Sequence, residues 1–254
     1  MQPDTVIETA AQRLLAAYPP GAMIPVPEDL VLEDETQAYA LQARISAALG
    51  TPSGWKLGGI VMGEIPRYSR LFAERSQLSP ARFSRGDFHR VYLEPELAVV
   101  MGEAVVPRDV PYRLEEIIPR VASLHAAIEL VDSRFEAWPE VPPLWQLADG
   151  LSHGAFVLGA AAPPENLSQM RDAPYRLDLD GETVISGKGG HPGGDPARLL
   201  VEMINAHVRA SGRGIDAGEV ITTGTFNGVV AMRAGQEARL AFPGIGEALL
   251  RLDA

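Results

Sequence analysis

The strongest structural signal in the chain is the stretch Tyr92-Leu93-Glu94-Pro95-Glu96-Leu97-Ala98-Val99-Val100. Its apolar and β-branched residues favour a strand, in which successive side chains point to opposite faces. Glu94 and Glu96 therefore share one face. Leu97 and Val99 lie on the other face, so we expect this strand to pack one side on a core and to present carboxylates on the other.

Short β-rich runs bounded by Gly, Pro or Asp surround this stretch and predict further strands. The predicted strands are Trp55–Ile60, Val91–Val100, Ala127–Val131, Ala155–Leu158, Tyr175–Leu179, Thr183–Ile185, Val220–Thr223, Ala238–Phe242 and Ala248–Leu252. The predicted helices between them are Arg113–Ile118, Pro143–Ala148 and Pro196–Ala210, the last with Asp195 as its N-cap. An Asp-Gly pair at Asp180-Gly181 predicts a hairpin turn. Because strands and helices do not alternate regularly, a doubly wound parallel sheet is not expected.

The first fifty residues have a different, helical pattern. One helix is expected up to Pro19-Pro20-Gly21, and a second from Asp34 to Gly50. We therefore expect an α+β protein with an N-terminal helical region over residues 1–53. A rolled, mixed and mostly antiparallel β-sheet is expected over residues 54–254, as one compact unit.

Composition restricts the classes of partner and chemistry. Of 254 residues, 22 are Lys or Arg and 33 are Asp or Glu, which gives a formal net charge of −11. This charge, without any basic run, argues against nucleic acid and anionic membrane surfaces as partners. The chain has no cysteine, which excludes disulfides, thiolate metal sites and Cys nucleophiles. It shows neither a basic signal-peptide region nor a run of apolar residues long enough to span a bilayer, so we expect a cytoplasmic protein.

The two glutamates of the central strand allow two interpretations. They could form a solvated face at a sheet edge, where Pro95 interrupts the hydrogen-bond ladder, and spacing alone favours this. Alternatively, a divalent cation could relieve the repulsion between Glu94 and Glu96. Glu129 supports the second interpretation, because a lone glutamate in an apolar run is seldom buried unless it is paired or coordinated. Carboxylate oxygens would suit Mg²⁺, Mn²⁺ or Ca²⁺ better than Zn²⁺, and three carboxylates with waters would complete an octahedral Mg²⁺ site.

One lysine, Lys56, lies in the apolar, glycine-bounded segment Gly54–Gly59. If it is buried, its pKa should be lowered and it could act as a general acid or base. If its amine instead reaches solvent, no such role follows. The pattern GxSxG is absent, which argues against a serine hydrolase.

Other polar residues are given simpler interpretations. Ser152 can donate its hydroxyl to a carboxylate. Arg134 is expected to form a structural salt bridge, and His153, His191 and His207 are interpreted as packed or surface residues. The corner at Thr223-Gly224 either ends a strand or offers backbone N–H groups to an anion.

Taken in order, the motifs resemble one known family. AYALQ, GWKLG, EPELAVV, AIELVDSR, SHGAFVLG, SGKG, ITTG and FPGIGEALLRL occur between about Ala38 and Leu252. Their order is similar to that of the 2-oxopent-4-enoate hydratase / 4-oxalocrotonate decarboxylase family, within the fumarylacetoacetate hydrolase-like superfamily. The resemblance implies a rolled sheet of the fumarylacetoacetate hydrolase C-terminal type, a Mg²⁺ or Mn²⁺ cofactor and a homo-oligomer.

The resemblance also implies roles for individual residues. It places the metal ligands at Glu94, Glu96 and Glu129 and makes Lys56 the catalytic lysine.

Substrate contacts are implied as well. Ser152, Thr223 and Gly224 fall where the family holds the substrate's carboxylate. Arg67 stands where hydratases commonly have an acidic residue; it is no base at neutral pH but could bind a second carboxylate.

The implied activity is that of a lyase in aromatic compound catabolism. It would hydrate a 2-hydroxydienoate or 2-oxo-enoate produced by meta-cleavage, through a metal-stabilised enolate. The same scaffold could instead support 4-oxalocrotonate-type decarboxylation or C–C hydrolysis of the acylpyruvate type, and Arg67 favours a substrate with two carboxylates. A non-catalytic partner subunit is the alternative from another class.

Overall fold

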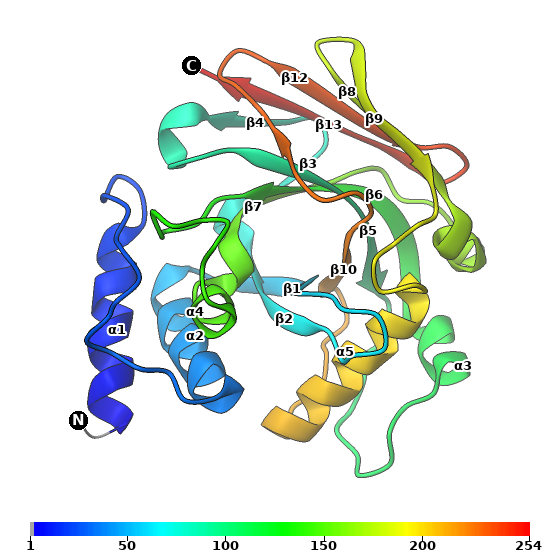
Figure 1. The fold of residues 1–254 in the computed structure, drawn as a ribbon. Coiled ribbons are helices and arrows are strands. Elements are labelled where there is room, and N and C mark those ends of the chain that lie inside the picture. Colours follow the sequence, from blue (N-terminus) through cyan, green and yellow to red (C-terminus); the bar gives the residue numbers. More distant parts are fainter. Residues whose placement is uncertain (1–2) are drawn as a thin grey trace.

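The computed structural model describes residues 3–254 and is drawn in Figure 1. Its α-helices are α1 (Pro3–Ala17), α2 (Glu35–Leu49), α3 (Leu114–Ile117), α4 (Pro143–Ala148) and α5 (Pro196–Ser211). Its short 3-10 helices are η1 (Ala73–Arg75), η2 (Arg85–Asp87), η3 (Ile118–Arg120), η4 (Gly150–Ser152) and η5 (Pro164–Asp172). Its strands are β1 (Pro52–Gly58), β2 (Arg67–Phe72), β3 (Ser76–Leu78), β4 (Ala81–Ser84), β5 (Tyr92–Met101), β6 (Val121–Val131), β7 (His153–Leu158), β8 (Pro174–Leu179), β9 (Glu182–Lys188), β10 (Val220–Thr225), β11 (Val230–Ala231), β12 (Glu237–Phe242) and β13 (Gly246–Asp253).

The N-terminal helices form where the sequence predicts them. Asp34 caps α2, because its side chain accepts a hydrogen bond from the backbone N–H of Gln37 at 2.9 Å. Helices α1 and α2 lie beside α4 on one side of the molecule (Figure 1), and Leu41 and Trp145 share their apolar cluster. Since α4 comes from far along the chain, this helical layer is not built by residues 1–53 alone, and the boundary at residue 53 stays a prediction.

The strands form two sheets, which Figure 1 shows as curved layers facing each other. The first has eight strands in the order β2-β1-β10-β5-β6-β7-β3, with β11 paired to β5; the second has the order β4-β13-β12-β8-β9. Only β1–β10, β3–β7 and β4–β13 are parallel among the strand pairs of residues 3–254. The prediction of a mixed, mostly antiparallel sheet is confirmed, but the structure divides that sheet into two.

The main apolar core lies between the two sheets. It includes Leu97 and Val99 from β5, on the face opposite to Glu96, and Leu240 from β12. The longest described helix, α5, packs on this core near β10 and is capped by Asp195, whose carboxylate accepts from the backbone N–H of Ala197. No helix in the described chain is both long and apolar enough to cross a membrane.

Turn chemistry explains the β8–β9 hairpin. Asp180 and Gly181 have φ angles of +51° and +85°. Both central residues are left-handed, as a tight hairpin turn requires, so this prediction is confirmed.

Strand β2 is one of four strands that the sequence pattern does not predict. It contains Arg67 and Arg70, which interrupt any apolar alternation. The guanidinium of Arg70 lies 3.4 Å from the centroid of the Trp55 ring and donates to Glu219 at 2.6 Å. The strand is therefore stabilised by partners that are remote in the sequence.

The parallel pairing of β1 with β10 joins two strands that lie far apart in the sequence. Gly54 lies opposite Val220, and a Cβ added at Gly54 would stand 2.1 Å from the Val220 carbonyl oxygen. Only glycine permits this approach. It places Lys56, two residues further on, in the same sheet as β5 and β6, with β10 between β1 and β5.

Candidate metal centre and active site

Three glutamates meet on neighbouring strands of the first sheet. Glu94 and Glu96 point to one face of β5, and the antiparallel register places Glu94 directly opposite Glu129 on β6. One carboxylate oxygen from each residue lies within 4.8 Å of the others. The structure thus brings together the three acids that the sequence analysis singled out.

This cluster is largely buried, and several of its carboxylate oxygens lack hydrogen-bond partners in the described chain. Glu96 and Glu129 are 0% exposed. Within residues 3–254, no group bonds either carboxylate oxygen of Glu96 or the Oε2 atom of Glu129. Because β5 lies between β10 and β6, the interpretation of Glu94 and Glu96 as a solvated sheet edge is wrong.

The electrostatics of the cluster favour a bound cation. Burial and the neighbouring charge of Glu129 raise the pKa of Glu94 to about 7. The same two causes raise the pKa of Glu96 well above its ordinary value. Oxygen-only ligands with excess negative charge suit a hard divalent ion. The chemistry of these donors therefore fits a hard divalent cation.

Lys56 reaches the cluster from β1. Its Nζ donates to Glu129 Oε1 at 2.5 Å and to the carbonyl oxygen of Leu151 at 2.9 Å. Of the two alternatives that the sequence left open, the buried one is correct, since the side chain is 2% exposed. The predicted lowering of its pKa is wrong: burial favours the neutral amine, but the charges of Glu129 and Glu94 outweigh burial and raise the pKa of Lys56.

His153 contacts the same glutamate from the first residue of β7. Its Nδ1 lies 3.1 Å from Glu129 Oε1. Of the interpretations as a packed or a surface residue, the packed one is correct for His153. Apart from the polar pair Ser152-His153 before an apolar strand, no signal in the sequence points to its contact with Glu129. Burial lowers the pKa of His153, which keeps the ring neutral.

Ser152 follows an unusual backbone turn. Leu151 and Ser152 have φ angles of +56° and +59°, a left-handed conformation that costs about 1–2 kcal/mol per non-glycine residue. The turn aims the Leu151 carbonyl at Lys56. It also leaves the Ser152 hydroxyl buried with no hydrogen-bond partner in the described chain. The predicted donor is therefore available to a ligand.

The Thr223-Gly224 corner is a bulge in β10. The register between β10 and β5 shifts between Thr222 and Thr225, and Gly224 has a φ of +85°. The hydroxyl of Thr223 donates to the Leu97 carbonyl at 3.0 Å. Neither Thr223 nor Gly224 is among the residues that line the cavity beside Lys56, as far as the described chain goes.

Arg67 is also placed away from the acids. Its Nη2 atom lies 2.7 Å from Oε1 of Glu35, the first residue of α2. It does not belong to the described lining of the cavity. The structure thus brings Lys56, Ser152 and the three glutamates together, and keeps Arg67 apart from them.

A second buried ion pair joins Arg134 to Asp149. The structural salt bridge predicted for Arg134 is thus present, and the structure identifies its partner. The Arg134 Nε donates to Asp149 Oδ1 at 2.5 Å, and the other guanidinium nitrogens donate to the carbonyls of His153 and Asp149. The remaining Asp149 oxygen accepts from Ser133 Oγ at 3.0 Å. Both charges are fully bonded within the protein.

A cavity of about 490 Å³ opens beside Lys56, Glu94 and Ser152. The rest of its wall is largely apolar and includes Tyr92, Val131, Trp138, Pro139, Leu151 and Val229. In the described chain, Lys56 is the single cationic side chain of this lining. The lining of the cavity therefore combines a few charged and polar groups with a largely apolar wall.

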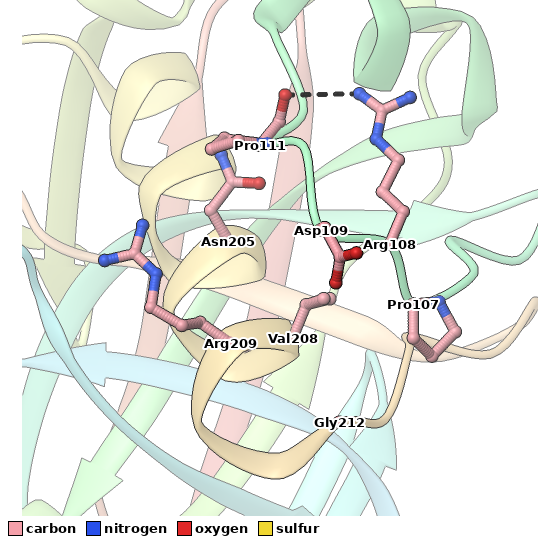
Figure 2. A pocket seen from close by; sticks show the side chains of 8 residues that line it. All are labelled: Pro107, Arg108, Asp109, Pro111, Asn205, Val208, Arg209 and Gly212. Carbon is pink, nitrogen blue, oxygen red and sulfur yellow. Dashed lines mark hydrogen bonds between the residues drawn. The ribbon is translucent and has the colours of Figure 1, made fainter.

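A separate hollow of about 380 Å³ lies between α5 and the segment before α3 (Figure 2). Arg108 in its wall donates to the carbonyl of Pro111 at 3.2 Å and to Glu116 at 2.8 Å. Asn205 is bonded in both directions to the backbone of Tyr112. Arg108 and Asn205 are therefore already paired. Within the described chain, the cluster of three acids that could hold a metal lies in the other site, beside Lys56.

Comparisons with known proteins agree with this geometry. Residues 67–252 match the family model described as fumarylacetoacetate (FAA) hydrolase C-terminal. The chain is 27% identical over 254 residues to 2-keto-4-pentenoate hydratase 1 of Dechloromonas aromatica (strain RCB), covering 94% of each protein. It is 26% identical over 260 residues to the TodF product hydratase of Pseudomonas putida, covering 94% of this chain and 92% of that protein.

Solved structures share the fold. The 4-oxalocrotonate decarboxylase from Pseudomonas putida G7, complexed with magnesium and adipate, matches with a TM-score of 0.84 at 21% identity, covering 99% of this chain and 98% of that one. A fumarylpyruvate hydrolase from Pseudomonas aeruginosa, in complex with Mn²⁺ and pyruvate, matches with a TM-score of 0.57 at 17% identity, covering 80% and 90%. The predicted curled mixed sheet is therefore a known architecture.

Proposed function

Since the chain belongs to the fumarylacetoacetate (FAA) hydrolase C-terminal family, we propose that it is a divalent-metal-dependent hydratase acting on a 2-hydroxydienoate or 2-oxo-enoate. The observation that carries the proposal is the buried cluster of Glu94, Glu96 and Glu129 beside Lys56 and an open cavity. The hydratase names of relatives that cover nearly the whole chain support it.

Glu94, Glu96 and Glu129 would hold the metal ion. Mg²⁺ or Mn²⁺ is proposed because the donors are all carboxylate oxygens, and because related structures are complexed with magnesium, calcium or Mn²⁺. When bound, the ion supplies positive charge that stabilises negative charge developing on the substrate's 2-oxygen.

Lys56 is proposed to move the protons. Its raised pKa makes it an ammonium, so Nζ can give a proton to the far carbon of the conjugated dienol and take back the proton that the 2-hydroxyl loses, which leaves a 2-oxo-3-enoate. Water then adds across the remaining double bond: its oxygen bonds to the carbon β to the ketone, and its proton passes to the carbon α to the ketone. The balance is one water added per turnover. The contacts of Nζ with Glu129 and Leu151 hold it in place meanwhile.

Ser152 is proposed to bind the substrate's carboxylate, because its buried hydroxyl faces the cavity and is free within residues 3–254. Thr223 and Gly224 do not line this cavity, so they could contribute to carboxylate binding only from the neighbouring bulge in β10. The carboxylate end of the substrate would thus lie near the glutamates and its tail near Trp138.

The largely apolar wall of the cavity favours hydration over decarboxylation. A 4-oxalocrotonate-type substrate carries a second carboxylate, which needs a cationic partner when it is desolvated. In the described lining Lys56 is the single cation, and it is paired with Glu129. Arg67 is engaged with Glu35. Decarboxylation remains the second candidate because of the close likeness in fold to a solved decarboxylase.

The test is a product analysis on metal-depleted protein. With Mg²⁺ or Mn²⁺ restored, 2-hydroxypenta-2,4-dienoate should lose its dienol absorbance faster than the spontaneous rate and gain the mass of one water. Glu96→Gln and Lys56→Met should each abolish this turnover, whereas the buried-histidine control His125→Ala should retain it. Release of CO₂ from 4-oxalocrotonate would instead favour the decarboxylase.

Two results would contradict the proposal altogether. If Mn²⁺ and the head-group mimic oxalate bind but neither substrate turns over, the non-catalytic partner subunit is the better interpretation. If neither binds, the glutamates are structural. Light scattering on the same samples measures the homo-oligomer that the family resemblance implies.

A further inference from the structure

The two oxygens of Glu129 have different surroundings. Oε1 is contacted by Lys56 Nζ at 2.5 Å and by His153 Nδ1 at 3.1 Å. Oε2 is buried and has no hydrogen-bond partner among residues 3–254. The carboxylate is therefore held through one oxygen and leaves the other available.

The direction of the His153 contact follows from the chemistry of its partner. An ionised carboxylate only accepts hydrogen bonds, so Nδ1 must carry the ring proton and donate it to Oε1. The ring itself cannot turn freely, because the side chain is 4% exposed and packed at the start of β7. His153 is thus a fixed, neutral donor behind a candidate ligand.

We propose that His153 is a positioning residue of the metal centre, which fixes the Glu129 carboxylate so that Oε2 alone faces the cation. This inference rests on the proposed metal site. Lys56 cannot do the same work throughout turnover, because its Nζ must exchange protons with the substrate. Donors behind metal-binding groups orient them and change metal affinity about 10–100-fold in other proteins.

His125 provides a matched control on the neighbouring part of the structure. It lies on β6, the strand that carries Glu129, and is also buried. Its Nδ1 lies 2.9 Å from the Gly159 carbonyl oxygen, and its Nε2 lies 2.8 Å from Ser123 Oγ. His125 is therefore buried as His153 is, and replacing it by alanine removes the same imidazole ring. It contacts none of the three candidate metal ligands.

The experiment compares Mn²⁺ affinity in four metal-depleted proteins: wild type, His153→Ala, His153→Asn and His125→Ala. Titration followed by the electron paramagnetic resonance of free Mn²⁺ needs no substrate. His153→Ala should weaken binding about tenfold or more. His153→Asn should stay within about threefold of wild type, because its amide nitrogen takes the place of Nδ1, and His125→Ala should bind as wild type does.

Melting temperatures in EDTA separate positioning from packing. Equal losses of affinity in His153→Ala and His153→Asn, with equal drops in melting temperature, would overturn the inference in favour of a packing role. A His153→Ala affinity within twofold of wild type would also overturn it, while leaving the metal site intact. Failure of the wild type itself to bind Mn²⁺ would instead remove the proposed function, a result distinct from both.

Discussion

Two buried ion pairs stand close together in this fold and are bonded differently. The Arg134–Asp149 pair is saturated, because backbone carbonyls and the Ser133 hydroxyl complete what the two charges need. The Lys56–Glu129 pair lies in a site with more acidic than basic groups, because Glu94 and Glu96 lie beside it. In the described chain, Glu96 has no hydrogen-bond partner at all.

The difference separates a structural pair from the proposed metal site. A buried polar network stabilises a protein only when its members are satisfied, and unpaired members are costly. Arg134 and Asp149 meet that condition without help, so they anchor the loops around β6 and β7. The glutamate cluster does not meet it within the described protein, which indicates that something else completes it.

The largest expected effect comes from breaking the saturated pair. Asp149→Ala leaves the buried Arg134 charge without its partner, and the free energy of unfolding should fall by about 3–5 kcal/mol. Urea denaturation measures the change. If the free energy of unfolding fell by less than about 1 kcal/mol, the pair would contribute little to stability and the prediction would be wrong.

Metal binding should stabilise only the unsaturated cluster. At an Mn²⁺ concentration 100 times the dissociation constant, wild type should gain about 2.7 kcal/mol. Glu96→Gln should show no such gain, yet in EDTA it should be at least as stable as wild type, because it removes a buried charge that has no partner. A metal-dependent gain that survives in Glu96→Gln would contradict the proposed ligand set.

Lowering the pH should stabilise the metal-free protein through Glu94. An ordinary salt-bridged carboxylate has the opposite effect, because its protonation at low pH destabilises the folded state. The pKa of Glu94 is raised to about 7 in the folded protein, so between about pH 4.5 and 7 the folded state binds more protons than the unfolded state. The free energy of unfolding should therefore fall as the pH rises through this window, on the order of 1 kcal/mol after allowing for the partial exposure of Glu94. Urea titrations in EDTA should show this slope, and Glu94→Gln should reduce it.

The smallest effect is expected at an ion pair that is neither buried nor part of the cluster. Arg67→Ala removes the pair with Glu35, which is partly exposed, and should cost about 0.5 kcal/mol or less. The kcat/KM for an uncharged-tail dienoate should stay within about twofold of wild type. A tenfold loss would place Arg67 in contact with substrate, as the sequence analysis suggested for a dicarboxylate.

Local patterns in the sequence predicted the elements whose cause is local. Asp34 and Gly50 bound α2, and Asp180-Gly181 turns the β8–β9 hairpin, as expected from capping and turn chemistry. The shared face of Glu94 and Glu96 follows from strand geometry alone. The family resemblance, carried by several motifs in order, is confirmed by the match over residues 67–252.

Features that depend on register or on remote partners could not be predicted. Alternation does not say which residue of β6 lies opposite Glu94, and a shift of one residue would have sent Glu129 to the other face. The pKa of Lys56 was predicted in the wrong direction because its apolar neighbours in sequence hide the acids that surround it in space. His153 was missed for the same reason, since its partner lies 24 residues away.

The left-handed turn at Leu151 and Ser152 has a consequence for how this chain can change. Glycine at either position would relieve the backbone, and a search for stabilising mutations would favour it. Ser152→Gly would also delete the hydroxyl that faces the cavity, and Leu151→Gly would delete the side chain that packs against Gly58. Stability and activity are thus opposed at this turn, so a lineage evolving for heat resistance should find its gains elsewhere in the fold.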